Sequence, residues 1–143
     1  MRNVVIFLVL LLFAVPVRAE MVDGTGVICE DPKGVKDRIY FFYGGKVHEV
    51  YMGAYELVYV MKLIKYEFSD SVISWSMPIR GTTWEYRRQV DIKTSVLLME
   101  NINHAPNAVS VKASYDCLIT DTAGIEEQFG PGSLDSIVKD RGT

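Results

Sequence analysis

The two cysteines of this chain, Cys29 and Cys117, constrain the fold more than any other feature of the sequence, because they are its only cysteines and lie far apart. Their spacing is much too long for a redox Cys-x-x-Cys motif. An even number of cysteines in an exported protein predicts a disulfide. For a loop of this length, the loop-entropy model gives about 4.5 kcal/mol of stabilisation. The fold must therefore bring an early segment and a late segment together.

Residues 1–19 predict export. A basic start leads into an apolar run over residues 4–17, and a small-residue site ends at Ala19. This is the pattern of a signal peptide cleaved before Glu20. An uncleaved membrane anchor is the alternative, but a span needs about 20 apolar residues, and this run is shorter and contains Pro16. We expect a periplasmic or secreted protein that is not embedded in a membrane after cleavage.

The charge of the mature chain excludes some partners. Removing the signal peptide takes away Arg2 and Arg18 and leaves 13 basic against 18 acidic residues, a net charge near −5. No run of basic residues is present, so we expect neither nucleic-acid binding nor attraction to an anionic membrane surface. The length predicts one β-barrel domain over residues 20–120. A polar tail follows over residues 121–143, with a short helix starting near Ser133 as one interpretation.

The clearest periodicity surrounds the second cysteine. From 109 to 119 the odd positions carry mostly apolar side chains and the even positions mostly polar ones, the odd set being Val109, Val111, Ala113, Tyr115, Cys117 and Ile119. This alternation predicts a strand with one buried face. The same parity places Val27 beside Cys29 in an early strand. We therefore expect a disulfide inside the fold, between the first and the last strand.

Further β-rich runs are bounded by turn residues, and we expect strands over 38–43, 46–52, 72–77, 82–90 and 94–100. Gly44 and Gly45 suit a two-residue hairpin turn, and residues 91–93 suit a second turn. Trp75 is expected in the core. Residues 55–68 fit helical spacing and strand composition alike, and we favour a strand because the neighbouring segments are strands.

Seven or eight short antiparallel strands with tied terminal strands predict an all-β fold, a small barrel closed by one disulfide. A two-layer β-sandwich is the alternative, since alternation alone does not distinguish the two architectures.

No group of residues indicates catalysis. The two histidines, His48 and His104, have no zinc-ligand spacing. A nucleophile elbow, a phosphate-binding glycine loop and a dinucleotide fingerprint are all missing from the sequence. We expect a protein without enzymatic activity, metal or cofactor. Binding of a protein or a cell-envelope component is the favoured function.

The best local binding candidate combines aromatic and cationic side chains, namely Trp84, Tyr86, Arg87, Arg88 and Lys93. On a strand, Trp84, Tyr86 and Arg88 share a face. We favour the interpretation that the aromatics belong to the core, that Arg88 emerges near the rim and that Arg87 faces water. A lipocalin-like carrier with a small ligand inside the barrel is the second hypothesis. It ranks lower because side chains fill small barrels.

The outline resembles small exported bacterial β-barrel proteins with a single disulfide, the type to which the periplasmic inhibitors of c-type lysozyme belong. The likeness rests on the signal peptide, the early Gly-Val-Ile ending at Cys29, the Tyr- and Trp-rich strands and the late Tyr-Asp ending at Cys117. The Ser-Gly-x-x-Tyr segment of that family has no match, and Gly53-Ala54-Tyr55 comes nearest. The resemblance therefore implies a fold, and it transfers no inhibitory residue.

Overall fold

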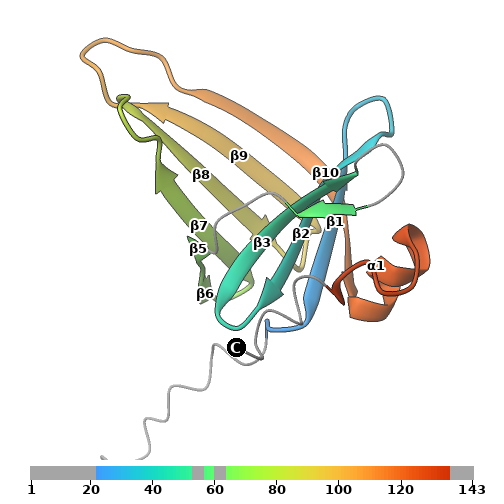
Figure 1. The fold of residues 1–143 in the computed structure, drawn as a ribbon. Coiled ribbons are helices and arrows are strands. Elements are labelled where there is room, and N and C mark those ends of the chain that lie inside the picture. Colours follow the sequence, from blue (N-terminus) through green and yellow to red (C-terminus); the bar gives the residue numbers. More distant parts are fainter. Residues whose placement is uncertain (1–21, 53–56, 60–63, 136–143) are drawn as a thin grey trace, which may run out of the picture.

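The computed structural model describes residues 22–52, 57–59 and 64–135, which form a nearly closed antiparallel β-barrel with one short helix (Figure 1). The predicted all-β class and barrel architecture are confirmed. The expected signal peptide over residues 1–19 lies outside the described residues, as do residues 53–56, 60–63 and 136–143.

The described strands are β1 (Thr25–Glu30), β2 (Lys36–Tyr43), β3 (Lys46–Met52), β4 (Leu57–Tyr59), β5 (Ile64–Lys65), β6 (Glu67–Ser69), β7 (Val72–Pro78), β8 (Trp84–Asp91), β9 (Val96–Asn103) and β10 (Val111–Asp121). The helix α1 (Thr122–Phe129) follows. Nine strands pair in the order β4-β3-β2-β1-β10-β9-β8-β7-β6, and β5 pairs with β3. Because β5 is separated from β6 by one residue, this last pairing nearly closes the barrel.

The ambiguous segment 55–68 is the reason why the described part of the chain holds more strands than the seven or eight expected. Its described residues form β4, β5 and the start of β6, and they contain no helix. The interpretation as strand therefore holds for these residues, whereas 55–56 and 60–63 lie outside them.

Strand β10 changes its partner at Cys117. Residues 111–116 pair with β9, whereas Cys117 to Asp121 pair with β1, and Cys117 lies directly opposite Cys29. The Cys117 N–H donates to the Ser95 carbonyl at 2.8 Å and so points away from β1. The cysteines therefore occupy a non-hydrogen-bonded pair, where side chains approach most closely. The predicted Cys29–Cys117 disulfide between the terminal strands is present.

The hairpin at Gly44 and Gly45 is confirmed, since Tyr43 pairs with Lys46 and both glycines have positive φ, 66° and 71°. The predicted turn at 91–93 lies one residue too early. Asp91 pairs with Val96, so the turn spans 92–95, and Ser95 supplies a φ of 57°. The alternation predicted from Val109 onward also begins too early, because Val109 precedes β10 and is 80% exposed.

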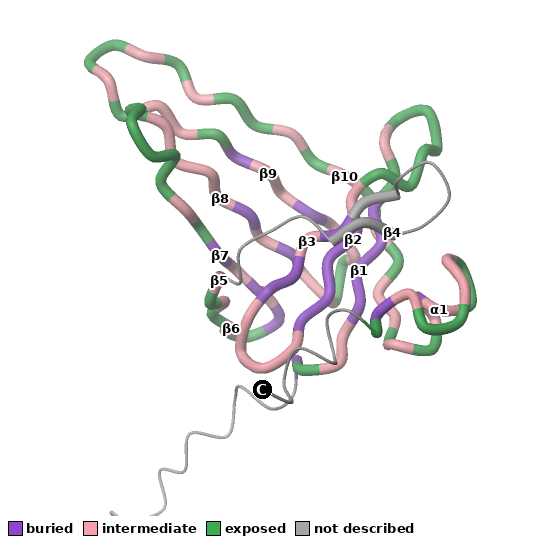
Figure 2. Tube along the Cα trace, in the orientation of Figure 1, coloured by how far each residue is buried: buried purple, intermediate pink, exposed green. Residues whose placement is uncertain are grey.

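The core lies inside the barrel near the disulfide. Its buried members include Val27, Cys29, Tyr40, Phe42 and Trp75, which confirms Trp75 as a core residue. In Figure 2 the buried segments follow β1 and β2 and the ends of β7 to β9 nearest those strands, while the far ends of β7 to β10 are less buried.

A second apolar cluster covers the outer face of β1 and β2. Ile28, Ile39 and Phe41 point outward and pack against Ile125 of α1 and Leu134 of the tail. The helix expected near Ser133 would extend into residues 136–143, outside the described residues, and stays a prediction. A helix that the sequence did not indicate, α1, begins earlier, at Thr122. Its N-cap is Asp121, whose carboxylate accepts from the Gly124 N–H at 2.9 Å. The tail forms part of the core packing.

Candidate binding site inside the barrel

The inner face of β7 to β10 is arranged in rows set by the strand register. The deep row is Ile73, Val90, Leu97 and Tyr115; the middle row is Trp75, Arg88, Met99 and Ala113; the outer row is Met77, Tyr86, Asn101 and Val111. Exposure increases along these rows, from complete burial of Val90 and Leu97 to 58% exposure of Val111. Beyond the outer row, Trp84 pairs with Asn103. The rows lead from an apolar core to an open aromatic and amide surface.

Arg88, in the middle row, is the most unusual residue of this face, because its charged side chain is only 3% exposed. Its Nη1 donates to the carbonyls of Arg87 and Glu100 at 2.8 and 3.1 Å and to the Asn101 amide oxygen at 3.2 Å. The guanidinium carbon lies 3.4 Å from the centre of the Tyr86 ring. Burial lowers the pKa of Arg88, and the nearby Tyr40 and Glu49 oppose that shift.

Two groups of the Arg88 side chain lack the partners that burial normally requires. Within the described residues, its Nε–H has no hydrogen-bond acceptor. In the same part of the chain, no carboxylate oxygen lies within 4.0 Å of its guanidinium nitrogens. Buried charges are normally paired and fully hydrogen-bonded, so Arg88 is an exception that calls for an explanation.

Glu49 of β3 faces this cluster but is held by neutral donors. It accepts from the Trp75 indole at 3.4 Å and from the Tyr86 hydroxyl. Burial raises its pKa, while the Trp75 hydrogen bond and the charge of Arg88 oppose the shift. Tyr40 of β2 packs edge-on against Trp75 at 5.1 Å, and burial raises its pKa as well.

Arg38 of β2 brings a second guanidinium to the same interior. Its Nε donates to the Met99 sulfur at 3.0 Å, and its guanidinium carbon lies 4.5 Å from the centre of the Tyr115 ring. Met99 is also the cross-strand partner of Arg88. Two arginines therefore converge on one middle-row residue. Arg38 also pairs with the more exposed Asp37.

The structure separates the five residues that the sequence grouped as a binding candidate. Trp84, Tyr86 and Arg88 lie on the inner face, and Arg87 points to the outer face. Lys93 is exposed in the turn at the other end of β8. The expectation that Arg88 emerges near the rim is wrong, because two further inward-facing residues of β8, Tyr86 and Trp84, lie between it and the strand end.

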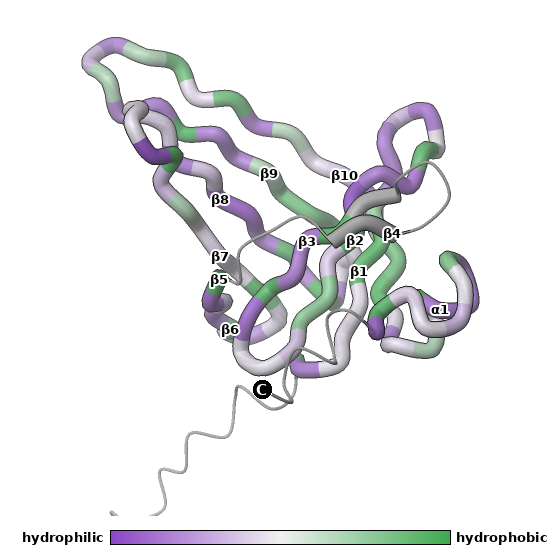
Figure 3. The backbone as a smooth tube through the Cα atoms, in the orientation of Figure 1, coloured by the Kyte–Doolittle hydropathy of each residue, from purple (hydrophilic) through white to green (hydrophobic). Residues whose placement is uncertain are grey.

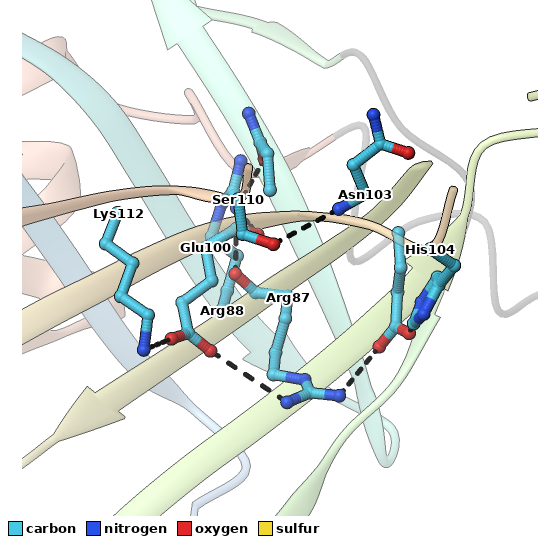
Figure 4. A network of polar contacts seen from close by, with 9 residues as sticks. Arg87, Arg88, Glu100, Asn103, His104, Ser110 and Lys112 are labelled. Carbon is cyan, nitrogen blue, oxygen red and sulfur yellow. Dashed lines mark hydrogen bonds and ion pairs between the residues drawn. The ribbon is translucent and has the colours of Figure 1, made fainter. Parts of the chain in front are cut away.

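Arg87 belongs to a ladder of ion pairs across the outer face of β8, β9 and β10 (Figure 4). His104 contacts Glu85 at 2.9 Å, Glu85 contacts Arg87 at 3.1 Å, and Glu100 contacts both Arg87 and Lys112. The hydrogen bond from His104 is the main cause that lowers the pKa of Glu85, with Arg87 adding to it. Arg87 is 43% exposed, and its charge is already paired.

Sequence reasoning missed Glu49, Tyr40, Arg38 and Asn101, which come from three other strands. The alternation of residues along the strand carried a partial signal, since Arg38 lies on the same face of the strand as the inward-facing Tyr40 and Phe42. Nothing in the sequence placed β2 and β3 opposite β8.

A polar hollow of about 300 Å³ also lies on the outer face of β6 to β8, lined among others by Lys65, Glu67, Arg87 and Gln89. The described residues contain no group of three or more His, Cys, Asp or Glu side chains that could hold a metal ion. No helix in the described ranges is long and apolar enough to cross a membrane.

No protein-family model, curated protein or solved structure matches this chain.

Proposed function

We propose that this chain is an exported, non-enzymatic binding protein that holds a small molecule on the inner face of β7 to β10. The row arrangement carries this proposal. A barrel interior filled by its own side chains would bury the outer row as completely as the deep row. Here Asn101 and Val111 of the outer row are exposed while Val90 and Leu97 of the deep row are fully buried.

The residue types of this face suit a ligand better than water alone. Trp84, Tyr86 and Met77 provide apolar and aromatic surface, and Asn101 and Asn103 provide amide groups that can orient a bound molecule. This mixture of apolar lining and few polar groups is typical of small-molecule sites. These observations move the carrier hypothesis ahead of the partner-protein hypothesis.

The two histidines lie away from the proposed site. His48 is buried on the outward side of β3 and lies 3.2 Å from the Tyr43 carbonyl, and His104 contacts Glu85 on the outer face. Neither lies on the inner face, where a ligand would bind.

Both tryptophans of the chain, Trp75 and Trp84, lie on the inner face, so intrinsic fluorescence reports on this site. The protein should be produced with export and purified without denaturation. We expect its native mass to exceed its denatured mass by that of a small molecule, and removal of that molecule to change the fluorescence. Equal masses, together with unchanged fluorescence across a library of small amphipathic compounds, would refute the proposal.

A partner protein or envelope component is the second candidate. Ile79, Val109 and Val111 are exposed apolar residues near the end of the barrel where β7 meets β8 and β9 meets β10. The two loops are joined by a bond from the His104 N–H to the Thr83 carbonyl at 2.8 Å. Such residues can anchor a protein contact. Capture of one envelope protein by the wild type, and its loss in Val109→Ser, would favour this function.

Inhibition of c-type lysozyme is the narrowest form of this second candidate, and the single-disulfide barrel is consistent with the resemblance that implies it. An assay of lysozyme activity with equimolar protein tests it directly. Full activity of the lysozyme would exclude lysozyme inhibition, and binding of another protein or envelope component would stay a candidate.

A further inference from the structure

The incomplete pairing of Arg88 indicates what the ligand carries. Strand β8 lies between β7 and β9, and the Arg88 side chain is only 3% exposed, so its guanidinium is shielded from water. A cation in such a position is unfavourable unless an anion or a full set of acceptors compensates for the lost water. Among the described residues, Glu49 is the carboxylate that influences it electrostatically, and Glu49 is hydrogen-bonded to Trp75 and Tyr86 instead.

The geometry of the guanidinium leaves one edge for a ligand. The carbonyls of Arg87 and Glu100 and the Asn101 amide accept from Nη1, and the Tyr40 hydroxyl is a further hydrogen-bond partner of the guanidinium. The Nε–H, which has no acceptor within the described ranges, lies on the opposite edge together with one N–H of Nη2. That edge presents two parallel donors, the arrangement that binds both oxygens of a carboxylate. The Tyr86 ring covers one face of the guanidinium, so an anion would approach within its plane.

The charge of the inner face also favours an anion. Arg38 and Arg88 both face Met99, and Glu49 balances one of these two charges. Asp37, the partner of Arg38, lies on the opposite side of β2 and is 40% exposed at its side chain. Because Arg38 is ion-paired with Asp37, Arg88 is the guanidinium of this face that has no carboxylate within ion-pair distance among the described residues, and it lies next to the apolar and aromatic side chains of Met77 and Tyr86.

We propose that Arg88 is the anchor for the carboxylate of an amphipathic ligand, whose apolar part lies along the outer row toward Trp84. This inference rests on the proposed function. Asn101, which is exposed and holds Nη1, borders the path from the outer row to the guanidinium. The carboxylate accepts from the Nε and Nη2 edge, and the apolar part covers side chains that are otherwise open to solvent.

Decanoate and decan-1-ol form a matched pair of probes, because they share the alkyl chain and differ in the charged group. Binding is measured by tryptophan fluorescence and calorimetry at pH 7 with wild type, Arg88→Met and Arg87→Met. We expect wild type to bind decanoate about 10- to 100-fold more tightly than decan-1-ol, the range of a charge-assisted hydrogen bond. Arg88→Met should lose this preference and still bind decan-1-ol. Arg87→Met, which removes the neighbouring outward charge, should keep it.

Three outcomes contradict the inference. Equal affinity of wild type for both probes shows that Arg88 anchors no carboxylate, yet it leaves the small-molecule function intact. If Arg88→Met and Arg87→Met lose the preference for decanoate equally, the preference arises from the overall charge of the protein and not from Arg88. Binding of neither probe overturns the inference, and the native-mass experiment then decides separately on the proposed function.

Circular dichroism verifies that each variant is folded. If Arg88→Met does not fold, Arg88→Lys replaces it, because lysine keeps the charge without the paired donors. We then expect a reduced but measurable preference for decanoate, and an unchanged preference would contradict the role of the paired edge.

Discussion

Strands β1 and β2 and strands β8 and β9 belong to one barrel but are buried in different ways. In β2 the four consecutive residues Ile39 to Phe42 are all nearly inaccessible, because the barrel core covers one face and α1 with Leu134 covers the other. No helix of the described residues covers the outer face of β8 and β9, and the ion-pair ladder occupies it instead. In Figure 3 the contrast is clearest between β2, which carries a hydrophobic stretch, and β8, which is largely hydrophilic.

This difference suggests that one region mainly stabilises the fold and that the other is available for binding. The half around β1 and β2 holds the disulfide and the second apolar cluster, and it shares the first cluster with the near ends of β7 to β9. We therefore expect this half and those near ends to provide most of the stability. The far ends of β7 to β10 extend beyond that half in Figure 1 and bury little. Surfaces that are incompletely buried by the fold itself remain for binding. Stability and binding can therefore be altered separately, which the following substitutions test.

Removal of the disulfide should have the largest effect, because it links β1 to β10 at the point where the two regions meet. The cysteines are 88 residues apart in sequence. Cys29→Ala with Cys117→Ala should lower the free energy of unfolding by about 4.5 kcal/mol. Urea unfolding of the oxidised wild type and the double variant measures this difference. Reduction of the wild type should reproduce the loss, and a change below about 1 kcal/mol would contradict the role of the disulfide.

Ile125→Ala should have the next largest effect, since it opens a cavity under the covered outer face of β1 and β2. The side chain is fully buried in the second cluster. We expect a loss of about 3 kcal/mol in the free energy of unfolding. Gln89→Ala, on the uncovered outer face of β8, is the matched control and should change stability by about 0.5 kcal/mol or less. Similar losses in both variants would abolish the distinction between the two outer faces.

Tyr86→Phe probes the border between the stable core and the open inner face. It removes the hydroxyl that donates to Glu49 and keeps the ring beneath Arg88. The free energy of unfolding should fall by about 1 kcal/mol, the usual value of one hydrogen bond. Tyr115→Phe serves as the control, because the Tyr115 hydroxyl makes no hydrogen bond among the described residues. Thermal unfolding of both variants should show a clear shift for Tyr86→Phe alone.

Glu85→Gln should have the smallest effect, and that effect should depend on pH. The pKa of Glu85 is lowered below its ordinary value of 4.5, mainly by the hydrogen bond with His104. A carboxylate with a lowered pKa stabilises the fold fully above pH 4.5 and loses that contribution as the pH falls through the lowered pKa. The melting temperature of the variant should therefore lie slightly below wild type at pH 6 and converge with it in strong acid. A constant difference across this range would show that the charge of Glu85 is not responsible.

The sequence predicted the barrel and the disulfide because both depend on local parity. Val27 and Cys29 alternate with outward residues as Tyr115 and Cys117 do, and strand geometry converts that alternation into a face. The unbroken apolar run from Ile39 to Phe42 also carried a signal that was not used, since such runs indicate strands covered on both sides. It could have predicted that both faces of β2 are covered, although not that α1 and the tail supply the outer cover.

The candidate site was only partly predictable. Parity placed Trp84, Tyr86 and Arg88 on one face, but it could not determine how far Arg88 lies from the end of the strand. That depth depends on how β8 is staggered against β7 and β9, and the stagger is fixed by pairing between segments distant in sequence.

The sequence by itself determined which residues share a face, that the terminal strands meet, and that the chain forms an antiparallel β-fold. Only the tertiary structure decided that Arg38 and Glu49 join Arg88, and that Arg87 is bound in a ladder on the other side. The physical reason is that alternation acts within a strand, whereas burial and charge pairing depend on which strands lie opposite one another across the barrel.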